Sequence, residues 1–118
     1  MTVSTHNLKT LYRGDSREYN LTFTNNEGGA IPITSWKVYF TVKLSYMDDD
    51  SKAVIKKDIT DHDDPENGKT IIKLLPNDTN IAPGNYYYDI KIKRAENDIR
   101  IILIGRVVVE QAITRRID

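Results

Sequence analysis

Apolar and polar residues alternate one by one in several short runs of the chain, and clusters of Gly, Pro, Asn and Asp separate these runs. Successive side chains of a β-strand point to opposite faces, so a period of two predicts strands, whereas a helical period is hard to find. In REYNLTFT, residues 17–24, Tyr19, Leu21 and Phe23 share one face, and the NNEGG that follows is typical of a turn. We therefore predict an all-β fold.

The other runs predict further strands between recognisable turns. They are WKVYFTVKLSY (36–46), AVIKKDI (53–59), KTIIKLL (69–75), the tyrosine run NYYYDIKI (85–92) and IRIILIGRVVVEQ (99–111). With a first strand near residues 8–12 this makes about seven strands, the number found in a small antiparallel β-sandwich of immunoglobulin-like type. A chain of 118 residues is long enough for one domain with a real core, so residues 1–118 are predicted to form a single domain.

Charge and cysteine content narrow the class of protein. Lys plus Arg and Asp plus Glu both number 17, so no net charge attracts the chain to nucleic acid or to an anionic membrane. Cysteine is absent, which excludes disulfides and thiolate metal sites. No apolar stretch approaches the length of a membrane span or a signal peptide, which predicts a soluble chain made without export.

The tyrosine run indicates how the core is built. An immunoglobulin-like sandwich has a Trp on its third strand, a Tyr at the start of its sixth, and a Cys two residues after that Tyr. Trp36, Tyr86 and Tyr88 occupy these three places. We expect Trp36, Phe40, Tyr86 and Tyr88 in the core, with Tyr87 pointing outward.

Two longer segments carry a family resemblance. They are YRGDSREYNLTFTNNEGGAIPITSWKVYFTVK and the pair IAPGNYYYDIKI and LIGRVVVEQAITR. Over nearly its whole length the chain resembles the immunoglobulin-like domain of phage tail and baseplate structural proteins of the upper-baseplate type. It departs from that pattern in its acidic loops at residues 47–50 and 58–66. The resemblance implies a structural role in the virion, synthesis in the host cytoplasm, and no catalytic residues.

Short motifs in the loops offer little chemistry. Arg13-Gly14-Asp15 matches an integrin-binding tripeptide, but Gly-Asp also suits a turn into a strand, and we favour the turn. The loop DHDDPEN contains the calcium candidates Asp61, Asp63, Asp64 and Glu66. Their spacing matches no EF-hand loop, and runs of charge in loops are usually solvated, so we expect no metal and no cofactor. His6 and His62 are the only histidines, and His6 is expected in an N-terminal tail, so we expect neither a zinc trio nor a catalytic triad. The chain is predicted not to be an enzyme.

One predicted sheet surface is more apolar than a solvent-facing surface should be. Outward positions of the third, sixth and seventh strands are Tyr39, Tyr87, Ile102, Ile104 and Val108. Clustered apolar residues on such a face indicate a protein interface. Coverage by the N-terminal segment, a bulge near Gly105, or a register shifted by one residue would also explain them.

We therefore predict a non-enzymatic protein-binding component of a phage tail or baseplate. Its partner is either another tail protein or a second copy of the chain. The alternatives are a host-surface or carbohydrate-binding module, for which the loops hold few aromatic residues, and a calcium-dependent domain that uses the acidic loops.

Overall fold

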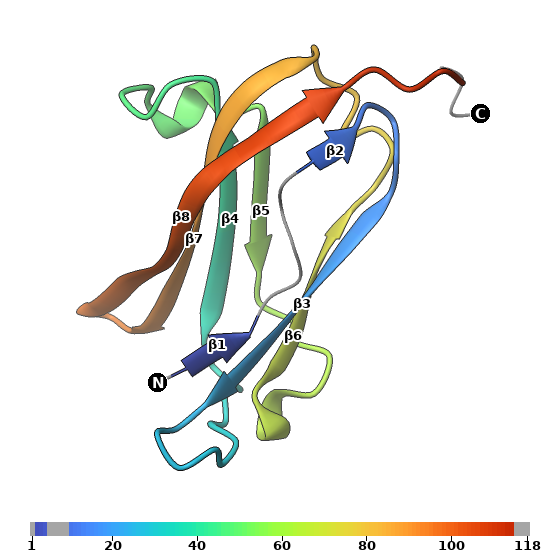
Figure 1. The fold of residues 1–118 in the computed structure, drawn as a ribbon. Helices are drawn as coiled ribbons and strands as arrows, with labels where there is room; N and C mark the ends of the chain where they lie inside the picture. Colours follow the sequence, from blue (N-terminus) through green and yellow to red (C-terminus); the bar gives the residue numbers. More distant parts are fainter. Residues whose placement is uncertain (1, 5–9, 115–118) are drawn as a thin grey trace.

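The computed structural model describes residues 2–4 and 10–114, and Figure 1 shows its strands and two short 3-10 helices. Among these residues there is no helix with the length and apolar composition needed to cross a bilayer. In chain order the elements are β1 (Thr2–Ser4), β2 (Thr10–Tyr12), β3 (Arg17–Thr24), β4 (Lys37–Lys43), η1 (Asp50–Lys52), β5 (Ile55–Ile59), η2 (Pro65–Asn67), β6 (Lys69–Leu74), β7 (Gly84–Ala95) and β8 (Asp98–Glu110). The all-β prediction is confirmed. His6 and residues 8 and 9 of the predicted first strand lie outside the described residues.

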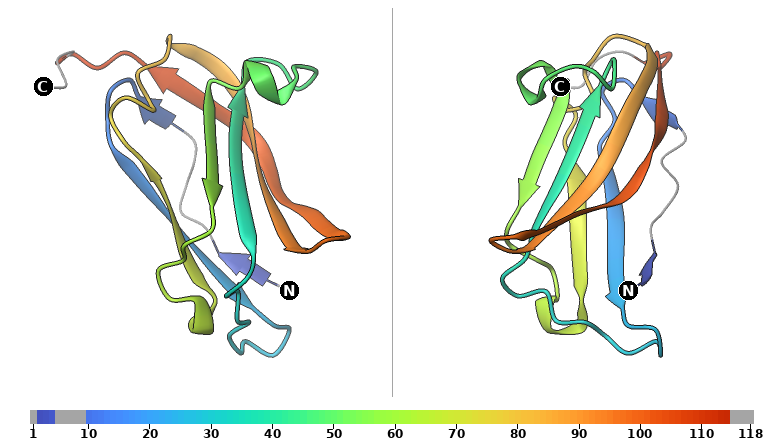
Figure 2. Two further views of the ribbon diagram at one scale, coloured as in Figure 1. Left: turned by 180° about the vertical axis from the view of Figure 1, so that it is seen from behind. Right: turned by 90° about the vertical axis from the view of Figure 1, so that its left-hand side faces the viewer.

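The strands form two sheets. One has the order β1-β3-β6, and the other has the order β2-β8-β7-β4-β5. Neighbouring strands are antiparallel with one exception: β2 pairs in parallel with the end of β8, from Thr10 opposite Val108 to Tyr12 opposite Glu110. The prediction of a purely antiparallel fold is therefore wrong at this edge. The N-terminal segment contributes β1 to one sheet and β2 to the other, so the two sheets share one end of the chain (Figure 2).

Side chains from both sheets form one buried cluster. Tyr19 of β3 packs against Phe40 of β4 with ring centroids 6.2 Å apart. The largest side chains with almost no exposed surface are Tyr19, Phe23, Phe40, Leu11, Leu21, Ile33, Ile72, Leu74, Ile90 and Ile92. Burial of each large apolar side chain stabilises the fold by roughly 1.5–3 kcal/mol, so this cluster supplies the main favourable contribution to folding.

Two of the four predicted core aromatics are fully in the core. Phe40 is 1% exposed and Tyr86 is 5% exposed, as predicted. The hydroxyl of Tyr86 also donates a hydrogen bond to the carbonyl oxygen of Ala82, at 2.5 Å. This bond ties the start of β7 to the turn that precedes it, so Tyr86 contributes both packing and a local constraint.

Trp36 and Tyr88 are only partly buried, each for a visible reason. Trp36 lies just before β4 instead of on it, and it packs edge-on against Phe23 with centroids 5.4 Å apart. Phe40, not Trp36, is the aromatic residue of β4 that packs beside Tyr88, at 6.1 Å. The Tyr88 ring lies over Gly105 of β8, where an added Cβ would come within 3.0 Å of it. The predicted place of Trp36 on the third strand is therefore wrong, and Gly105 is what admits the Tyr88 ring.

Candidate functional site

The candidate site is the outer face of the five-stranded sheet, which the right-hand view of Figure 2 shows from the front. Three isoleucines of β8 point outward there: Ile99, Ile101 and Ile104 are all more than half exposed. Tyr87 of β7 and Tyr39 of β4 lie on the same face and are half-buried. Of the five predicted interface residues, the structure brings Tyr39, Tyr87 and Ile104 together, and Val108 lies toward the end of the face, opposite Asn85.

Ile102 does not belong to this face. The register between β7 and β8 shifts at a β-bulge, since Ile90 lies opposite Leu103 whereas the next residue, Lys91, lies opposite Ile101. Ile102 is the extra residue, and it packs partly buried against the core. A bulge shifts the alternation of a strand by one residue, so the outward residues on the N-terminal side of Ile102 are Ile101 and Ile99. The prediction of an outward Ile102 is wrong, and the two outward isoleucines were missed.

Charged residues of both signs alternate across the middle of the outer face. Tyr39 on β4 lies opposite Asp58 of β5 on one side and Lys91 of β7 on the other. Two residues further along β4 the signs are exchanged. There Thr41 lies between Lys56 of β5 and Asp89 of β7.

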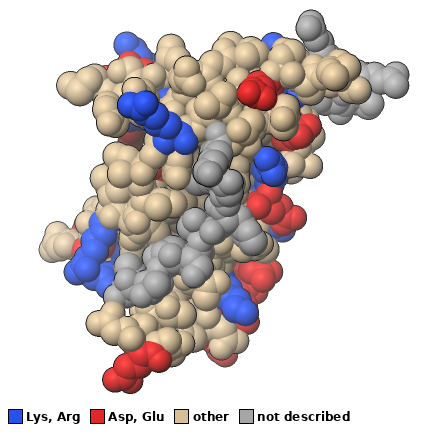
Figure 3. All heavy atoms as spheres, in the orientation of Figure 1, with Lys and Arg blue, Asp and Glu red and all other residues tan. Residues whose placement is uncertain are grey.

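These four charged side chains make no ion pair or hydrogen bond within the part of the chain that the structure describes. Burial is the main influence on Asp89 and raises the pKa of its carboxyl, although the nearby ammonium groups of Lys91 and Lys43 act in the opposite direction. Elsewhere on the molecule, charges of both signs also occur together, as along the right-hand margin of Figure 3. The outer face therefore combines unpaired charges, a partly desolvated carboxylate and exposed isoleucines.

The segment from Ser45 to Val54 covers one end of the face and closes a hollow that extends along the face to Lys91 and Ile99. Its anchor is Lys43, whose ammonium donates to the Asp50 carboxylate at 2.7 Å and to the carbonyl oxygen of Asp48 at 2.9 Å. The hydrogen bond between them raises the pKa of Lys43 and lowers that of Asp50. Because both charged forms are favoured in this pair, it holds the segment against β4 at neutral pH.

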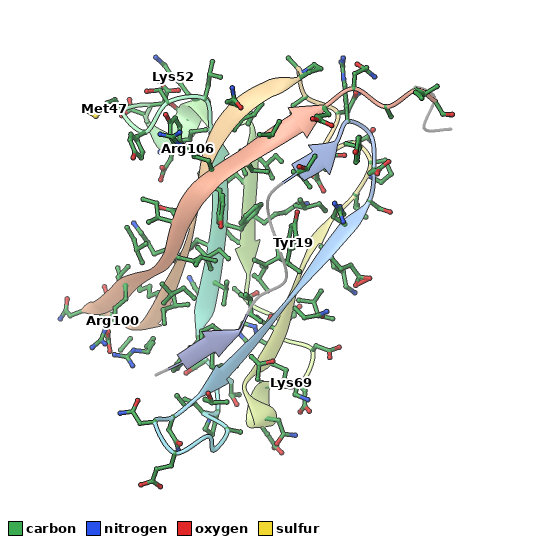
Figure 4. All side chains as sticks on the ribbon, in the orientation of Figure 1. Tyr19, Met47, Lys52, Lys69, Arg100 and Arg106 are labelled. Atoms are coloured by element: carbon green, nitrogen blue, oxygen red, sulfur yellow. The ribbon has the colours of Figure 1, made fainter. Side chains whose placement is uncertain are left out.

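Aromatic rings form the wall of this hollow. Tyr46 stacks on Tyr87 with centroids 4.4 Å apart and an interplanar angle of 22°, and the Arg106 guanidinium lies over the Tyr87 ring at 5.6 Å. Figure 4 shows Arg106 beside the covering segment that carries Met47 and Lys52. The hollow has a volume of about 440 Å³, and its lining includes Tyr39, Thr41, Tyr46, Tyr87, Asp89 and Ile104. Ligand pockets of proteins range over roughly 300–1,000 Å³, so its size is sufficient for a side-chain cluster or a small ligand.

The acidic loop does not assemble the predicted calcium candidates. Among residues 2–4 and 10–114, no three His, Asp or Glu side chains lie close enough together to hold a metal ion. Asp64 accepts a hydrogen bond from the Asn67 side chain at 2.9 Å, which closes the turn at η2. Asp61, Asp63 and Glu66 are part of the same loop without a shared site.

The other motifs have structural roles. His62 Nε2 lies 2.7 Å from the carbonyl oxygen of Trp36, and Nδ1 lies 2.9 Å from the Thr70 hydroxyl. Arg13-Gly14-Asp15 forms a turn after β2, closed by a hydrogen bond from the Asp15 amide to the carbonyl oxygen of Tyr12. The Arg13 side chain donates to Asn80 at 3.0 Å, so the guanidinium is held by the fold.

Comparison with known proteins gives no match, either among the models of protein families or among curated proteins.

Proposed function

We propose that this chain is a non-enzymatic structural component of a phage tail or baseplate, which docks onto other protein subunits through the outer face of the five-stranded sheet. The observation that carries the proposal is the exposed row Ile99, Ile101 and Ile104 beside Tyr87. A sheet face that meets only water is mostly polar, so exposed isoleucines next to a tyrosine are typical of a contact surface. The aromatic wall adds a rigid anchor of the kind enriched in interfaces.

We further propose that the two sheets form an immunoglobulin-like β-sandwich. Supporting this, the structural counterpart of a tyrosine corner is present, because the Tyr86 hydroxyl bonds back to Ala82 four residues upstream. The N-terminal segment contributes a short strand to each sheet, and β7 and β8 form a long hairpin beside β4. Tyr88 occupies the position of the second disulfide cysteine and packs against Phe40 of the same sheet. The contact of Tyr19 with Phe40 joins the two sheets, where an immunoglobulin domain has its disulfide.

Assignment to the phage tail rests on the resemblance of residues 12–43, 81–92 and 103–115 to the immunoglobulin-like domain of baseplate proteins. Those proteins are structural, which agrees with a face built for contact. Assembly into the virion after synthesis in the host cytoplasm is the corresponding location.

The test is co-expression with the proteins encoded by genes neighbouring that of this chain. We expect at least one tail protein to co-purify with the wild type, and Ile104→Asp to abolish this, because an unpaired carboxylate would have to be desolvated in the contact. Leu75→Asp is the matched control, since Leu75 is 61% exposed and Ile104 is 60% exposed. Loss of binding in both variants, or no binding by the wild type to any neighbouring product, would contradict the proposal.

Binding of a saccharide is the second candidate, and the hollow favours it. Tyr39 and Tyr46 provide aromatic surface, and unpaired acceptors and donors such as Asp89 and Lys91 match hydroxyl groups. Titration with neutral mono- and disaccharides at about 10 mM, followed by NMR, would detect even the weak affinity of a millimolar ligand. Shifts confined to residues of the hollow would support this function over protein docking.

A further inference from the structure

The charge pattern of the outer face is its own complement, and we propose that the face binds a second copy of this chain in a two-fold symmetric pair. This inference rests on the proposed docking function and specifies the partner. A two-fold interface uses the same patch on both subunits, so residue i contacts residue j and j contacts i. Such an interface requires a patch that matches itself after rotation.

Two adjacent rows across the sheet meet this requirement. The first row, from β5 to β8, is Asp58, Tyr39, Lys91 and Ile101, and the second is Lys56, Thr41, Asp89 and Ile104. Rotation by 180° about an axis that runs across the strands, between the two rows, places the first row of one copy over the second row of the other. Lys91 then meets Asp89, Asp58 meets Lys56, and Ile101 meets Ile104.

The free energy of this pairing comes from groups that lack partners in one copy. Asp89 is half-buried and its charged form is disfavoured by desolvation, so an ammonium from a second copy would offset that cost. Lys91 has no ion pair within the described residues, so contact with Asp89 breaks no existing bridge. The exposed isoleucines of β8 meet each other and leave water together.

The same rotation exchanges the two ends of the face. The row with Lys93 and Ile99, near the end of the hairpin, is placed over the row with Tyr87 and Arg106, at the hollow. Figure 4 shows these two ends, with Arg100 at the hairpin end and Arg106 at the covered end. Ile99 of each copy is thus placed over Arg106 of the other, and Lys93 over Tyr87. Lys43 would face Lys37, but its charge is already compensated by Asp50.

A mixing experiment tests the contact directly. Asp89→Lys places two lysines opposite each other in a homodimer, and Lys91→Asp places two aspartates opposite each other. We expect each variant alone to dimerise about tenfold or more weakly than the wild type, because like charges face each other in the contact. An equal mixture should form a heterodimer with an affinity close to that of the wild type, because Lys and Asp are again opposite at both contacts.

Native mass spectrometry and sedimentation of the single variants, the mixture and the double variant Asp89→Lys/Lys91→Asp supply the measurement, with circular dichroism as the check of folding. The β5 variants Asp58→Lys and Lys56→Asp provide a second pair at exposed positions, should a change at half-buried Asp89 prevent folding. Lys73→Asp, on β6 of the other sheet, is the control and should dimerise as the wild type does.

The outcomes separate this inference from the docking function. A wild type that stays monomeric at about 1 mM, or variants that are not rescued by mixing, overturns the two-fold pairing. If such a monomer still binds a neighbouring tail protein in a manner lost in Ile104→Asp, the docking function stands and only the self-pairing fails. If neither self-association nor partner binding occurs, both fail.

Discussion

Replacement of Gly68 by alanine tests the packing of the acidic loop against the turn that follows β3. Gly68 ends η2 with φ of +71°, and a Cβ added there would lie 2.6 Å from the carbonyl oxygens of both Phe23 and Ile31. Its own carbonyl accepts a hydrogen bond from the Phe23 amide at 2.8 Å, so the loop cannot shift without loss of that bond. Gly68→Ala should therefore destabilise the fold through both conformation and collision.

Two contributions determine how much stability Gly68→Ala should lose. A left-handed conformation costs a non-glycine residue about 1–2 kcal/mol. Forcing an extra methyl into a packed site costs about 1–3 kcal/mol more. We expect a total of about 3 kcal/mol, a substantial part of the 5–15 kcal/mol by which a typical domain is stable.

Gly28→Ala is the matched control. Gly28 has φ of +85°, and nothing lies within 4 Å of an added Cβ, so only the conformational cost of about 1 kcal/mol applies. Urea unfolding of both variants can be followed through the fluorescence of Trp36, the single tryptophan. Equal losses of stability in the two variants would refute the close approach at Gly68.

Three further substitutions test the core and the outer face. The buried Tyr19 hydroxyl has no hydrogen-bond partner among residues 2–4 and 10–114, so Tyr19→Phe should raise the free energy of unfolding by about 1 kcal/mol, and a loss of stability in urea unfolding would contradict this. Tyr86→Phe removes the bond to Ala82 and should lower the free energy of unfolding by about 1 kcal/mol in the same assay, and an unchanged value would contradict a stabilising role of this bond. Burial raises the pKa of Asp89, so the folded chain holds this proton more tightly than the unfolded chain, and stability falls as the pH rises through that window. At a concentration where the chain is monomeric, Asp89→Asn should therefore raise Tm at pH 7 but not at about pH 3, where the carboxyl is protonated. An equal change in Tm at both pH values would contradict the destabilising effect of burying the Asp89 carboxylate.

The strands with one buried face were predictable from the chain alone. The run at residues 17–24 coincides with β3, and its alternating residues Tyr19, Leu21 and Phe23 are all buried. When one face of a strand is buried and the other is exposed to solvent, apolar residues recur at every second position. This pattern predicts both the strand and the face that is buried. The outward position of Tyr87 and the inward position of Tyr86 follow from the same rule.

Features that depend on distant contacts were not predictable. Leu44 continues the apolar alternation of β4, yet it is 61% exposed, because the strand ends at Lys43. That lysine instead binds Asp50, and the covering segment and hollow result from this bond. An acidic run such as residues 48–50 is usually solvated, so the sequence carries no signal that one carboxylate anchors the segment.

The face to which each residue of β8 points could not be predicted for a different reason, which also bears on the proposed docking. Residues 101–104 are apolar at every position, so alternation cannot show which side is buried, and the bulge at Ile102 decides it. From Asp98 to Val107 no described strand pairs with the outer edge of β8, and an open edge invites pairing with a foreign strand. The bulge interrupts the regular ladder of backbone groups in that stretch, which makes such pairing unfavourable. The docking that we propose would therefore use side chains of the outer face, including the alternating charges of β5 and β7, and not backbone pairing at this edge.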